Sequence, residues 1–170
     1  MSSAVLHRRL QAQLEIAAGL HLRVAVAESL TGGLLADAFV SVPRASRVFS
    51  GGIVAYDTGL KRSLLGVDEE LLRVEGPVHP RVAEQMASGV RSACAVMLTH
   101  LGEALLADIG LATTGVAGPD PDPVTGQPAG TVWLGVSSRL GERSVLLHAA
   151  GTRAEIRARS VRAILGEFAA

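Results

Sequence analysis

Two hydrophobic periodicities follow one another along the chain and mark its expected elements. Short apolar runs bounded by glycine, proline or polar residues are typical of buried strands, whereas apolar residues three and four apart are typical of helices. Strands are predicted over residues 23–28, 48–56, 107–114, 131–137 and 143–149. Helices are predicted over residues 4–19, 31–41, 58–65, 69–73, 80–101 and 152–168.

The order of these elements predicts the fold class. Strands and helices alternate through the first two-thirds, and two successive strands near the end form a hairpin across Gly141. We therefore expect an α/β protein, a three-layer α/β/α sandwich with a mixed, mostly parallel sheet. Residues 1–170 contain no linker or internal repeat and are expected to form a single domain.

Composition excludes several classes of protein. The net charge is zero, which argues against nucleic acid or an anionic membrane as the main partner. No apolar run approaches the length of a membrane span, and the start lacks the apolar block of a signal peptide, so we expect a soluble cytoplasmic protein. Cys94, the only cysteine, lies within the longest predicted helix and is interpreted as a small buried hydrophobe.

The stretch from Glu28 to Gly33 is the first candidate for chemistry. Ser29, Thr31, Gly32 and Gly33 follow a buried strand and precede a helix, where unpaired amides and the helix dipole favour negative charge. Glycines let a ligand approach the backbone, so the corner suits an anion or a nucleophile with an oxyanion site. Alternatively, Ser29 or Thr31 caps the helix.

Two further strand ends carry polar residues, Tyr56 to Lys61 and Thr113 to Gly115. Ligands of open α/β sheets collect beyond such ends. No histidine falls there, which disfavours a Ser-His-Asp triad; His79 and His100 flank the longest predicted helix and are interpreted as its solvated ends.

Lys61 is the only lysine in the chain, and the other basic residues that accompany it are arginines. Lysine can be neutralised by burial and can then act as a base, whereas arginine stays protonated. The alternative is a coding bias toward arginine that leaves one lysine by chance. A Ser–Lys pair is a known form of activated nucleophile.

Other features predict structure rather than chemistry. The glycine pair Gly51-Gly52 inside a strand indicates a bulge or a close backbone approach. The loop 119–130 holds four of the seven prolines, and its Asp120 and Asp122 are interpreted as turn residues rather than cation ligands. There is no P-loop, dinucleotide fingerprint or zinc-spaced Cys/His cluster, so no metal is expected.

Several ordered blocks together resemble the CinA C-terminal domain family. The blocks are Ala27-Glu28-Ser29-Leu30-Thr31-Gly32-Gly33, Phe49-Ser50-Gly51-Gly52-Ile53-Val54-Ala55-Tyr56, Lys61 with Leu64-Leu65-Gly66-Val67, Thr114-Gly115-Val116-Ala117-Gly118-Pro119, and Pro128-Ala129-Gly130-Thr131-Val132. The ending Gly151-Thr152-Arg153-x-x-Ile156-Arg157 is also similar to that of the family. The resemblance covers about residues 6–168.

The resemblance implies an α/β/α fold and hydrolysis of the carboxamide of nicotinamide mononucleotide to nicotinate mononucleotide and ammonia. It implies no metal or organic cofactor, a small-molecule nucleotide substrate as partner, and a homodimer or higher homo-oligomer. Ser29 becomes the nucleophile and Lys61 its base, while Tyr56 and Thr114 line the site. Further substrate-binding positions are Thr31, Gly32, Gly33, Gly115, Gly118, Arg153 and Arg157.

Within that set, Thr31 and the Gly32-Gly33 backbone are expected to steady the oxyanion, with Thr31 also capping the helix. Arg153 and Arg157 are candidates for the phosphate, the alternative being surface arginines without a ligand.

The chain departs from the family pattern in several places. Leu30 stands where cysteine is frequent, His79 where serine is frequent, and Thr152 where the family has aspartate. Asp57-Thr58-Gly59 differs beside the proposed base, and the loop 119–128 is rich in proline rather than glycine. Many full-length relatives carry an additional N-terminal domain, for which this chain is too short. Two alternatives therefore stay open: a non-catalytic nucleotide-binding module, and an amidase for a different small amide.

Overall fold

The structure, a computed structural model, describes residues 3–98 and 103–169 and contains one five-stranded sheet of order β2-β1-β5-β6-β7. Its strands are β1 (Val24–Glu28), β2 (Phe49–Val54), β5 (Ile109–Gly115), β6 (Thr131–Ser138) and β7 (Gly141–His148). β1 pairs in parallel with β2 and β5, whereas β6 pairs antiparallel with β5 and β7. β6 therefore runs against the other four strands, and the predicted mixed, mostly parallel sheet is confirmed.

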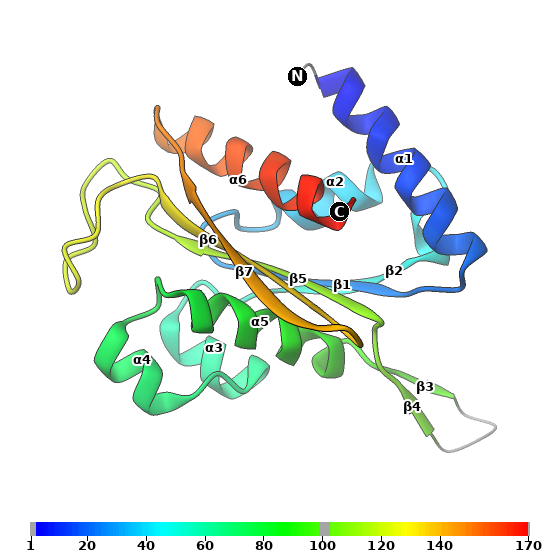
Figure 1. Cartoon of the computed structure of the whole chain (residues 1–170), viewed down its shortest axis with the longest axis horizontal. Helices are drawn as coiled ribbons and strands as arrows, with labels where there is room; N and C mark the ends of the chain where they lie inside the picture. Colours follow the sequence, from blue (N-terminus) through cyan, green and yellow to red (C-terminus); the bar gives the residue numbers. More distant parts are fainter. Residues whose placement is uncertain (1–2, 99–102, 170) are drawn as a thin grey trace.

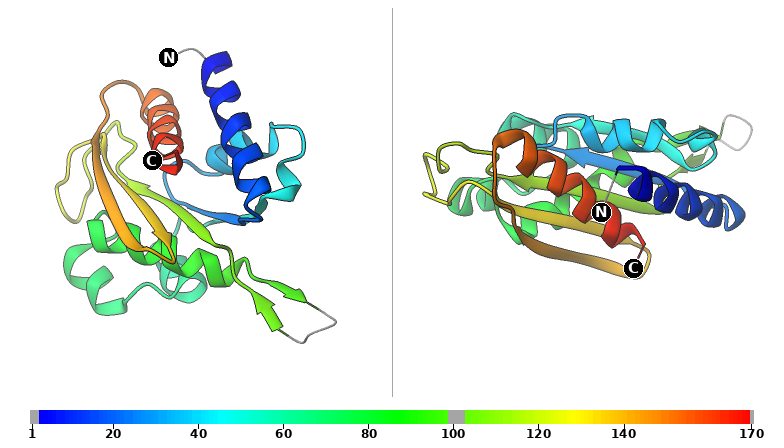
Figure 2. Two further views of the ribbon diagram at one scale, coloured as in Figure 1. Left: turned by 45° about the vertical axis from the view of Figure 1, so that its right-hand side comes forward. Right: turned by 90° about the horizontal axis from the view of Figure 1, so that it is seen from above.

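Helices cover both faces of the sheet, which confirms the three layers (Figures 1 and 2). One face carries α1 (Ser3–Gly19), α2 (Leu34–Val40) and α6 (Arg153–Phe168). The other face carries α3 (Thr58–Leu65), α4 (Glu69–Glu75) and α5 (Pro80–Ala93). A single 3₁₀ turn, η1 (Ala45–Arg47), leads from α2 to β2.

The central strand β1 separates two apolar cores. Val24 and Val26 pack with α1, α2 and α6, while Ala25 and Ala27 pack with α3, α4 and α5. All four are fully buried, as expected of a parallel strand covered on both faces. By the same alternation, Glu28 points to the α2 side of the sheet.

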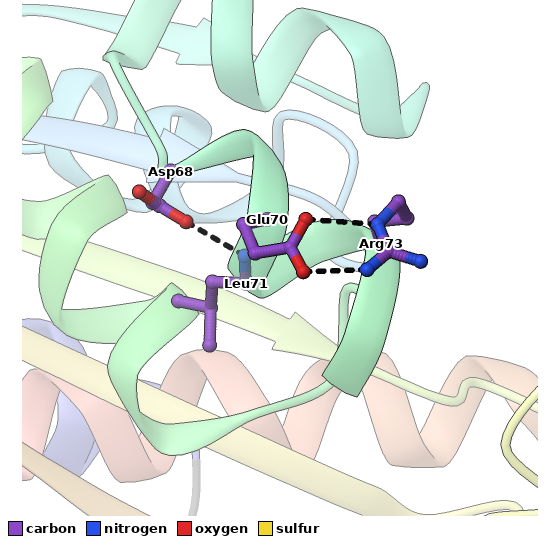
Figure 3. A network of polar contacts seen from close by, with 4 residues as sticks. All are labelled: Asp68, Glu70, Leu71 and Arg73. Atoms are coloured by element: carbon purple, nitrogen blue, oxygen red, sulfur yellow. Dashed lines mark hydrogen bonds and ion pairs between the residues drawn. The ribbon is translucent and has the colours of Figure 1, made fainter.

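Local capping interactions fix the short helix α4 (Figure 3). The Asp68 carboxylate accepts a hydrogen bond from the Leu71 amide at 2.7 Å and so caps the start of the helix. Glu70 and Arg73, one turn apart, form a bidentate ion pair in solvent. These exposed contacts lie on the side of the molecule that also carries α3 and α5.

The glycine pair in β2 coincides with a bulge beside β1. Val24 pairs with Phe49 and Ala25 with Gly51, so Ser50 is left as the extra residue. A Cβ added at Gly52 would lie 2.7 Å from Cγ2 of Val26. The predicted bulge and close approach are therefore both present.

The predicted helix over 80–101 is wrong beyond Ala93. A two-stranded hairpin, β3 (Val96–Leu98) with β4 (Glu103–Leu105), extends away from the body instead (Figure 2). Ala107 exchanges hydrogen bonds with Arg91 at the helix end, so α5 stops where β5 is about to begin. Met97, which continues the apolar spacing, is 59% exposed because no layer lies beneath it.

The prediction that Cys94 lies within a helix is therefore wrong, because Cys94 directly follows the last residue of α5. It is half-buried against Gly51, and burial raises the pKa of its thiol. His100 and Leu101, the last residues of the predicted helix, lie outside the described residues. None of the helices in the described ranges is both long and apolar enough to cross a membrane.

Candidate active site

A cavity of about 270 Å³ lies where β1, β2 and β5 end. These carboxyl ends are the place where open α/β sheets bind ligands. The lining residues come from three strand ends, from α3, from the segment between α4 and α5, from the start of α6 and from the proline-rich loop: Ser29, Leu30, Tyr56, Thr58, Lys61, Pro77, Val78, Thr114, Gly115, Val116, Ala117, Gly118, Pro119, Asp120, Pro121, Asp122, Pro123 and Arg153.

Ser29 follows β1 directly and is largely buried at the cavity wall. Its amide donates to the carbonyl of Thr113 at 3.0 Å, which continues the parallel pairing of β1 with β5 by one residue. Its hydroxyl accepts a hydrogen bond from the Lys61 ammonium, with Nζ 3.1 Å from Oγ. The structure therefore brings together the two residues that the sequence singled out separately.

Lys61 reaches Ser29 from the side of α3 and is 1% exposed. Its Nζ also donates to the carbonyl of Ala55 at 2.8 Å, immediately after β2. Burial lowers the pKa of Lys61 from 10.5 to about 8, against a smaller opposing effect of the Asp57 carboxylate. A lysine with this pKa is partly neutral near physiological pH and can accept a proton from a neighbouring hydroxyl.

Glu28 is a site residue that the sequence analysis did not assign. It is fully buried, and its carboxylate accepts hydrogen bonds from the amides of Gly33, Leu35 and Ala36 at 3.0, 3.0 and 2.8 Å. The anion-binding end of α2 is therefore occupied by a carboxylate from the chain itself. The signal in the sequence was an acidic residue on the α2 side of β1, close before a helix.

The roles predicted for Thr31, Gly32 and Gly33 are corrected by this arrangement. Glu28 caps α2, whereas the Thr31 hydroxyl shares a hydrogen bond with that of Thr113 at 2.8 Å. The Gly32 amide donates to the carbonyl of Ser29 at 3.1 Å, and the Gly33 amide is used by Glu28. Neither glycine amide is free to stabilise an oxyanion.

Two other amides at this corner are available. Within residues 3–98 and 103–169, the structure gives no acceptor to the backbone amides of Leu30 and Thr31. An amide that follows a nucleophile directly is well placed to donate to an oxyanion formed on the nucleophile's substrate. Leu30 lines the cavity, whereas Thr31 is fully buried and is not among the lining residues.

Tyr56, Thr114 and Arg153 lie at the cavity, as predicted. The Arg153 guanidinium donates to the Tyr56 hydroxyl and to the carbonyl of Gly118, each at 2.8 Å. Thr114 donates its hydroxyl to the carbonyl of Pro77 at 2.7 Å. The two Arg153 hydrogen bonds connect the start of α6 to the segments that follow β2 and β5, and the Thr114 bond connects β5 to the segment before α5.

Arg157, one turn further along α6, is not among the residues that line the cavity, contrary to the prediction for a phosphate ligand. Its guanidinium donates through Nε to the carbonyl of Leu30 and through a terminal nitrogen to that of Thr31, both at 2.9 Å. Arg157 therefore binds the protein backbone and not the open side of the cavity.

The proline-rich loop forms one wall of the cavity. Asp122 accepts hydrogen bonds from the Thr125 amide and hydroxyl and from the Val124 amide, which together lower the pKa of its carboxyl. The interpretation of Asp122 as a turn residue is thus confirmed. Gln127 fastens the loop by donating to the carbonyl of Val78 at 2.8 Å.

Outside the cavity wall, His79 caps α5 through Nδ1, which accepts from the Arg81 amide. Among the described residues, no group of three or more His, Cys, Asp or Glu side chains is placed to hold a metal ion.

Comparison with known proteins places this architecture in a family. Residues 7–169 match the CinA C-terminal domain. A CinA-like protein of Frankia casuarinae is 48% identical over 138 residues, covering 81% of this chain and 29% of that protein. A putative competence-damage inducible protein of Geobacillus kaustophilus is 41% identical over 140 residues, covering 82% of this chain and 31% of that protein. The chain thus spans less than a third of the length of these relatives.

Solved structures agree with the sequence match. A CinA superfamily protein from Escherichia coli superposes with a TM-score of 0.86 at 26% identity, covering 99% of this chain and 92% of that one. A competence/damage inducible protein from Agrobacterium tumefaciens gives a TM-score of 0.82 at 31% identity, covering 96% and 93%. The predicted resemblance is confirmed over nearly the whole chain: the protein belongs to the CinA C-terminal domain family.

Proposed function

We propose that this domain is an amidohydrolase that cleaves the carboxamide of nicotinamide mononucleotide to nicotinate mononucleotide and ammonia. The observation that carries the proposal is the buried contact of 3.1 Å between Lys61 Nζ and Ser29 Oγ. A serine needs a neighbouring base to become a nucleophile, and lysine is the titratable group that this contact supplies. The substrate identity rests on the family resemblance.

The pair supports an acyl-enzyme route. Neutral Lys61 takes the Ser29 proton as Oγ attacks the carboxamide carbon, which forms a tetrahedral oxyanion. The C–N bond then breaks, and the proton passes from Lys61 to the departing nitrogen, which leaves as ammonia. Water, deprotonated by the same lysine, attacks the ester; the C–Oγ bond breaks and Ser29 regains its proton.

We assign oxyanion stabilisation to the amides of Leu30 and Thr31, which have no acceptor within the described part of the chain. Donors of this kind stabilise charge that develops in the transition state and contribute strongly to the rate. The assignment replaces the Gly32-Gly33 backbone, whose amides are already used.

The nucleotide end of the substrate is assigned to the wall formed by Tyr56 and Arg153. Arg153 is the arginine among the cavity-lining residues, and a guanidinium is suited to a phosphate. Gly115 and Gly118 also line the cavity, but an added Cβ at each would meet the protein itself, Thr131 O at 2.6 Å and Ala129 Cβ at 2.9 Å, so these glycines serve packing beside the cavity.

Ammonia release from a panel of amides tests the proposal. The panel contains nicotinamide mononucleotide, nicotinamide riboside, nicotinamide and acetamide. We expect release from the mononucleotide, and a much higher KM for the riboside because it lacks the phosphate. Thermal stabilisation by the mononucleotide without ammonia release would instead indicate a binding module, and preferred turnover of a simple amide would indicate a different amidase.

The pH dependence of this reaction follows from the lysine. Lys61 acts as a base only when it is neutral, and with a pKa of about 8 roughly a tenth of it is neutral at pH 7. We therefore expect kcat/KM to rise with pH through about 8 and to level above it. A profile that is flat from pH 6 to pH 9 would contradict Lys61 as the base.

A further inference from the structure

We propose that Arg157 is a positioning residue that orients the oxyanion-stabilising backbone beside Ser29, and not a ligand of the substrate phosphate. The inference rests on the proposed function for its reaction, but its geometry stands independently. Arg157 is half-buried and contributes two hydrogen bonds of 2.9 Å to two consecutive carbonyls, Leu30 and Thr31. These residues follow the nucleophile directly.

Hydrogen bonds that fix the carbonyl of a peptide unit also fix the direction of its amide. In a trans peptide the C=O and the N–H point in opposite directions. When Arg157 holds the Leu30 carbonyl, the Thr31 amide in the same peptide unit must point away from the guanidinium. When it holds the Thr31 carbonyl, the Gly32 amide is directed likewise, and that amide donates to the carbonyl of Ser29.

The charge of Arg157 also acts on these peptide units. Hydrogen bonds from an ionised donor are stronger than neutral ones, and a polarised C=O makes the N–H of the same peptide a better donor. The guanidinium thus favours negative charge on the opposite side of the Leu30–Thr31 peptide, where an oxyanion would form.

Gly32 is explained by this contact. A Cβ added at Gly32 would lie 3.3 Å from a terminal nitrogen of Arg157, in a backbone with a φ of 54°. The missing side chain therefore makes room for the guanidinium rather than for a ligand. Both residues of this contact, the glycine at position 32 and the arginine at position 157, are therefore suited to each other.

The far end of the same segment is held by the opposite charge. The Glu28 carboxylate binds the amides of Gly33, Leu35 and Ala36, and Glu28 is the residue before the nucleophile. In the turn from Ser29 to α2, the Glu28 carboxylate thus binds backbone amides and the Arg157 guanidinium binds backbone carbonyls. Ser29 and the amides of Leu30 and Thr31 are at the start of this segment.

Arg153 offers a matched control because it occupies the same helix one turn earlier and lines the cavity. A residue that positions transition-state donors affects kcat, whereas a residue that binds the phosphate mainly affects KM. We expect Arg157→Gln to lower kcat by about 100-fold with KM nearly unchanged. We expect Arg153→Gln to raise KM for the mononucleotide about tenfold or more.

Arg157→Lys provides a second variant that retains the positive charge. A lysine can donate to one of the two carbonyls but cannot bridge both as the planar guanidinium does. Its kcat should lie between those of the wild type and Arg157→Gln. It also keeps the test open if the glutamine variant folds poorly, since folding of each variant is checked by its melting temperature.

The experiment pairs steady-state ammonia release with labelling of Ser29 by an alkyl fluorophosphonate. In labelling, the Oγ–P bond forms, fluoride leaves and the serine proton passes to Lys61. The labelling rate therefore measures the reactivity of Ser29 and its neighbouring backbone amides without any nucleotide. We expect Arg157→Gln to slow labelling at least tenfold, and Arg159→Gln, at an exposed position of α6 away from the cavity lining, to leave it near the wild-type rate. If wild type is labelled but releases no ammonia from the mononucleotide, the proposed function fails while the labelling rates still test Arg157. An Arg157→Gln variant that labels at the wild-type rate, or whose defect lies wholly in KM, overturns the proposal.

Discussion

At the scale of single residues, a short series of hydrogen bonds connects Ser29, the proposed nucleophile, to the sheet. The Glu28 carbonyl accepts from the Ala55 amide, the Ala55 carbonyl accepts from Lys61, and Lys61 donates to Ser29. β1 and β2 are adjacent parallel strands, so their ends bring the serine and the acceptor of the lysine to one place. The contact between Ser29 and Lys61 is therefore a consequence of strand pairing.

The carboxylate of Asp57 influences the pKa of Lys61, the proposed base. It opposes the effect of burial on the pKa of Lys61, and its Oδ1 caps α3 by accepting from the Gly59 amide at 2.7 Å. Asp57→Asn keeps an acceptor for the cap and removes the charge. The pKa of Lys61 should fall further, so the rising limb of the kcat/KM profile should move to lower pH.

The control for that shift is Glu70→Gln, which removes an exposed carboxylate paired with Arg73 on α4. Its profile should coincide with that of the wild type. A limb that moves to higher pH in Asp57→Asn would mean that the limb does not report on Lys61.

Glu28 contributes to stability as well as to the site. Glu28→Gln replaces one carboxylate oxygen by an amide group that cannot accept, so at least one of the three backbone amides bound to the buried Glu28 side chain loses its partner. We expect a loss of about 3 kcal/mol in the free energy of unfolding, measured in urea. Asp68→Asn, at a single cap on α4, should cost less than about 1 kcal/mol, and equal losses in the two variants would argue against the buried network.

At the scale of elements, glycines let α5 lie directly on its neighbours. Added Cβ atoms at Gly110 of β5 and Gly135 of β6 would lie 1.8 and 2.1 Å from carbonyl oxygens of α5. Gly89 of α5 is equally close to α3, with an added Cβ only 1.8 Å from the carbonyl oxygen of Leu65. Because α3 carries Lys61, this packing also sets the position of the base.

Two helical glycines therefore respond oppositely to alanine. Gly89→Ala should destabilise the protein by about 2 kcal/mol or more, since the methyl group must displace α3. Gly166→Ala, in α6 with nothing within 4 Å, should stabilise it by about 0.5–1 kcal/mol through helix propensity. Unfolding in urea measures both changes, and a stabilised Gly89→Ala variant would contradict the close contact.

The elements also show what the sequence could and could not predict. Helix 58–65, the bulge beside the Gly51-Gly52 pair and the hairpin at Gly141 follow from local signals and are all present. The end of α5 at Ala93 was missed because apolar spacing continues to Met97, and spacing does not reveal where the sheet beneath a helix ends.

For the candidate site, the sequence pointed to individual residues but not to their contacts with the backbone. Ser29 and Lys61 stand out as residue types, and strand order brings them together. The hydrogen bonds of Arg157 to the backbone could not be predicted, because contacts with main-chain atoms depend on three-dimensional placement. For Glu28 the sequence held only the signal of an acidic residue at the end of a strand, close before a helix.

At the scale of the whole molecule, the buried lysine makes stability depend on pH. The folded state holds Lys61 with a pKa of about 8, whereas the unfolded chain keeps it near 10.5. Between these values the unfolded state binds more protons, so the free energy of unfolding gains from this group as the pH rises from about 8 to 10.5. The full gain is about 3 kcal/mol.

Lys61→Met should remove this gain while preserving the volume of the side chain. At pH 7 the variant should be more stable than the wild type by up to about 3 kcal/mol, because burying a charged lysine carries that cost. Thermal unfolding at pH 7 and at pH 10 measures the difference between the two proteins at each pH. A difference that does not shrink at pH 10 would contradict the lowered pKa.

The central claim is that Ser29 and Lys61 act as one nucleophile–base pair on a carboxamide. Ammonia release from nicotinamide mononucleotide at pH 8.5, above the Lys61 pKa of about 8 so that most of the lysine is neutral, tests it most directly when wild type, Ser29→Ala and Lys61→Met are compared. Both variants should fold and lose at least about 1,000-fold in kcat/KM, with no further loss in the double variant. Either single variant with activity within tenfold of the wild type would contradict the claim.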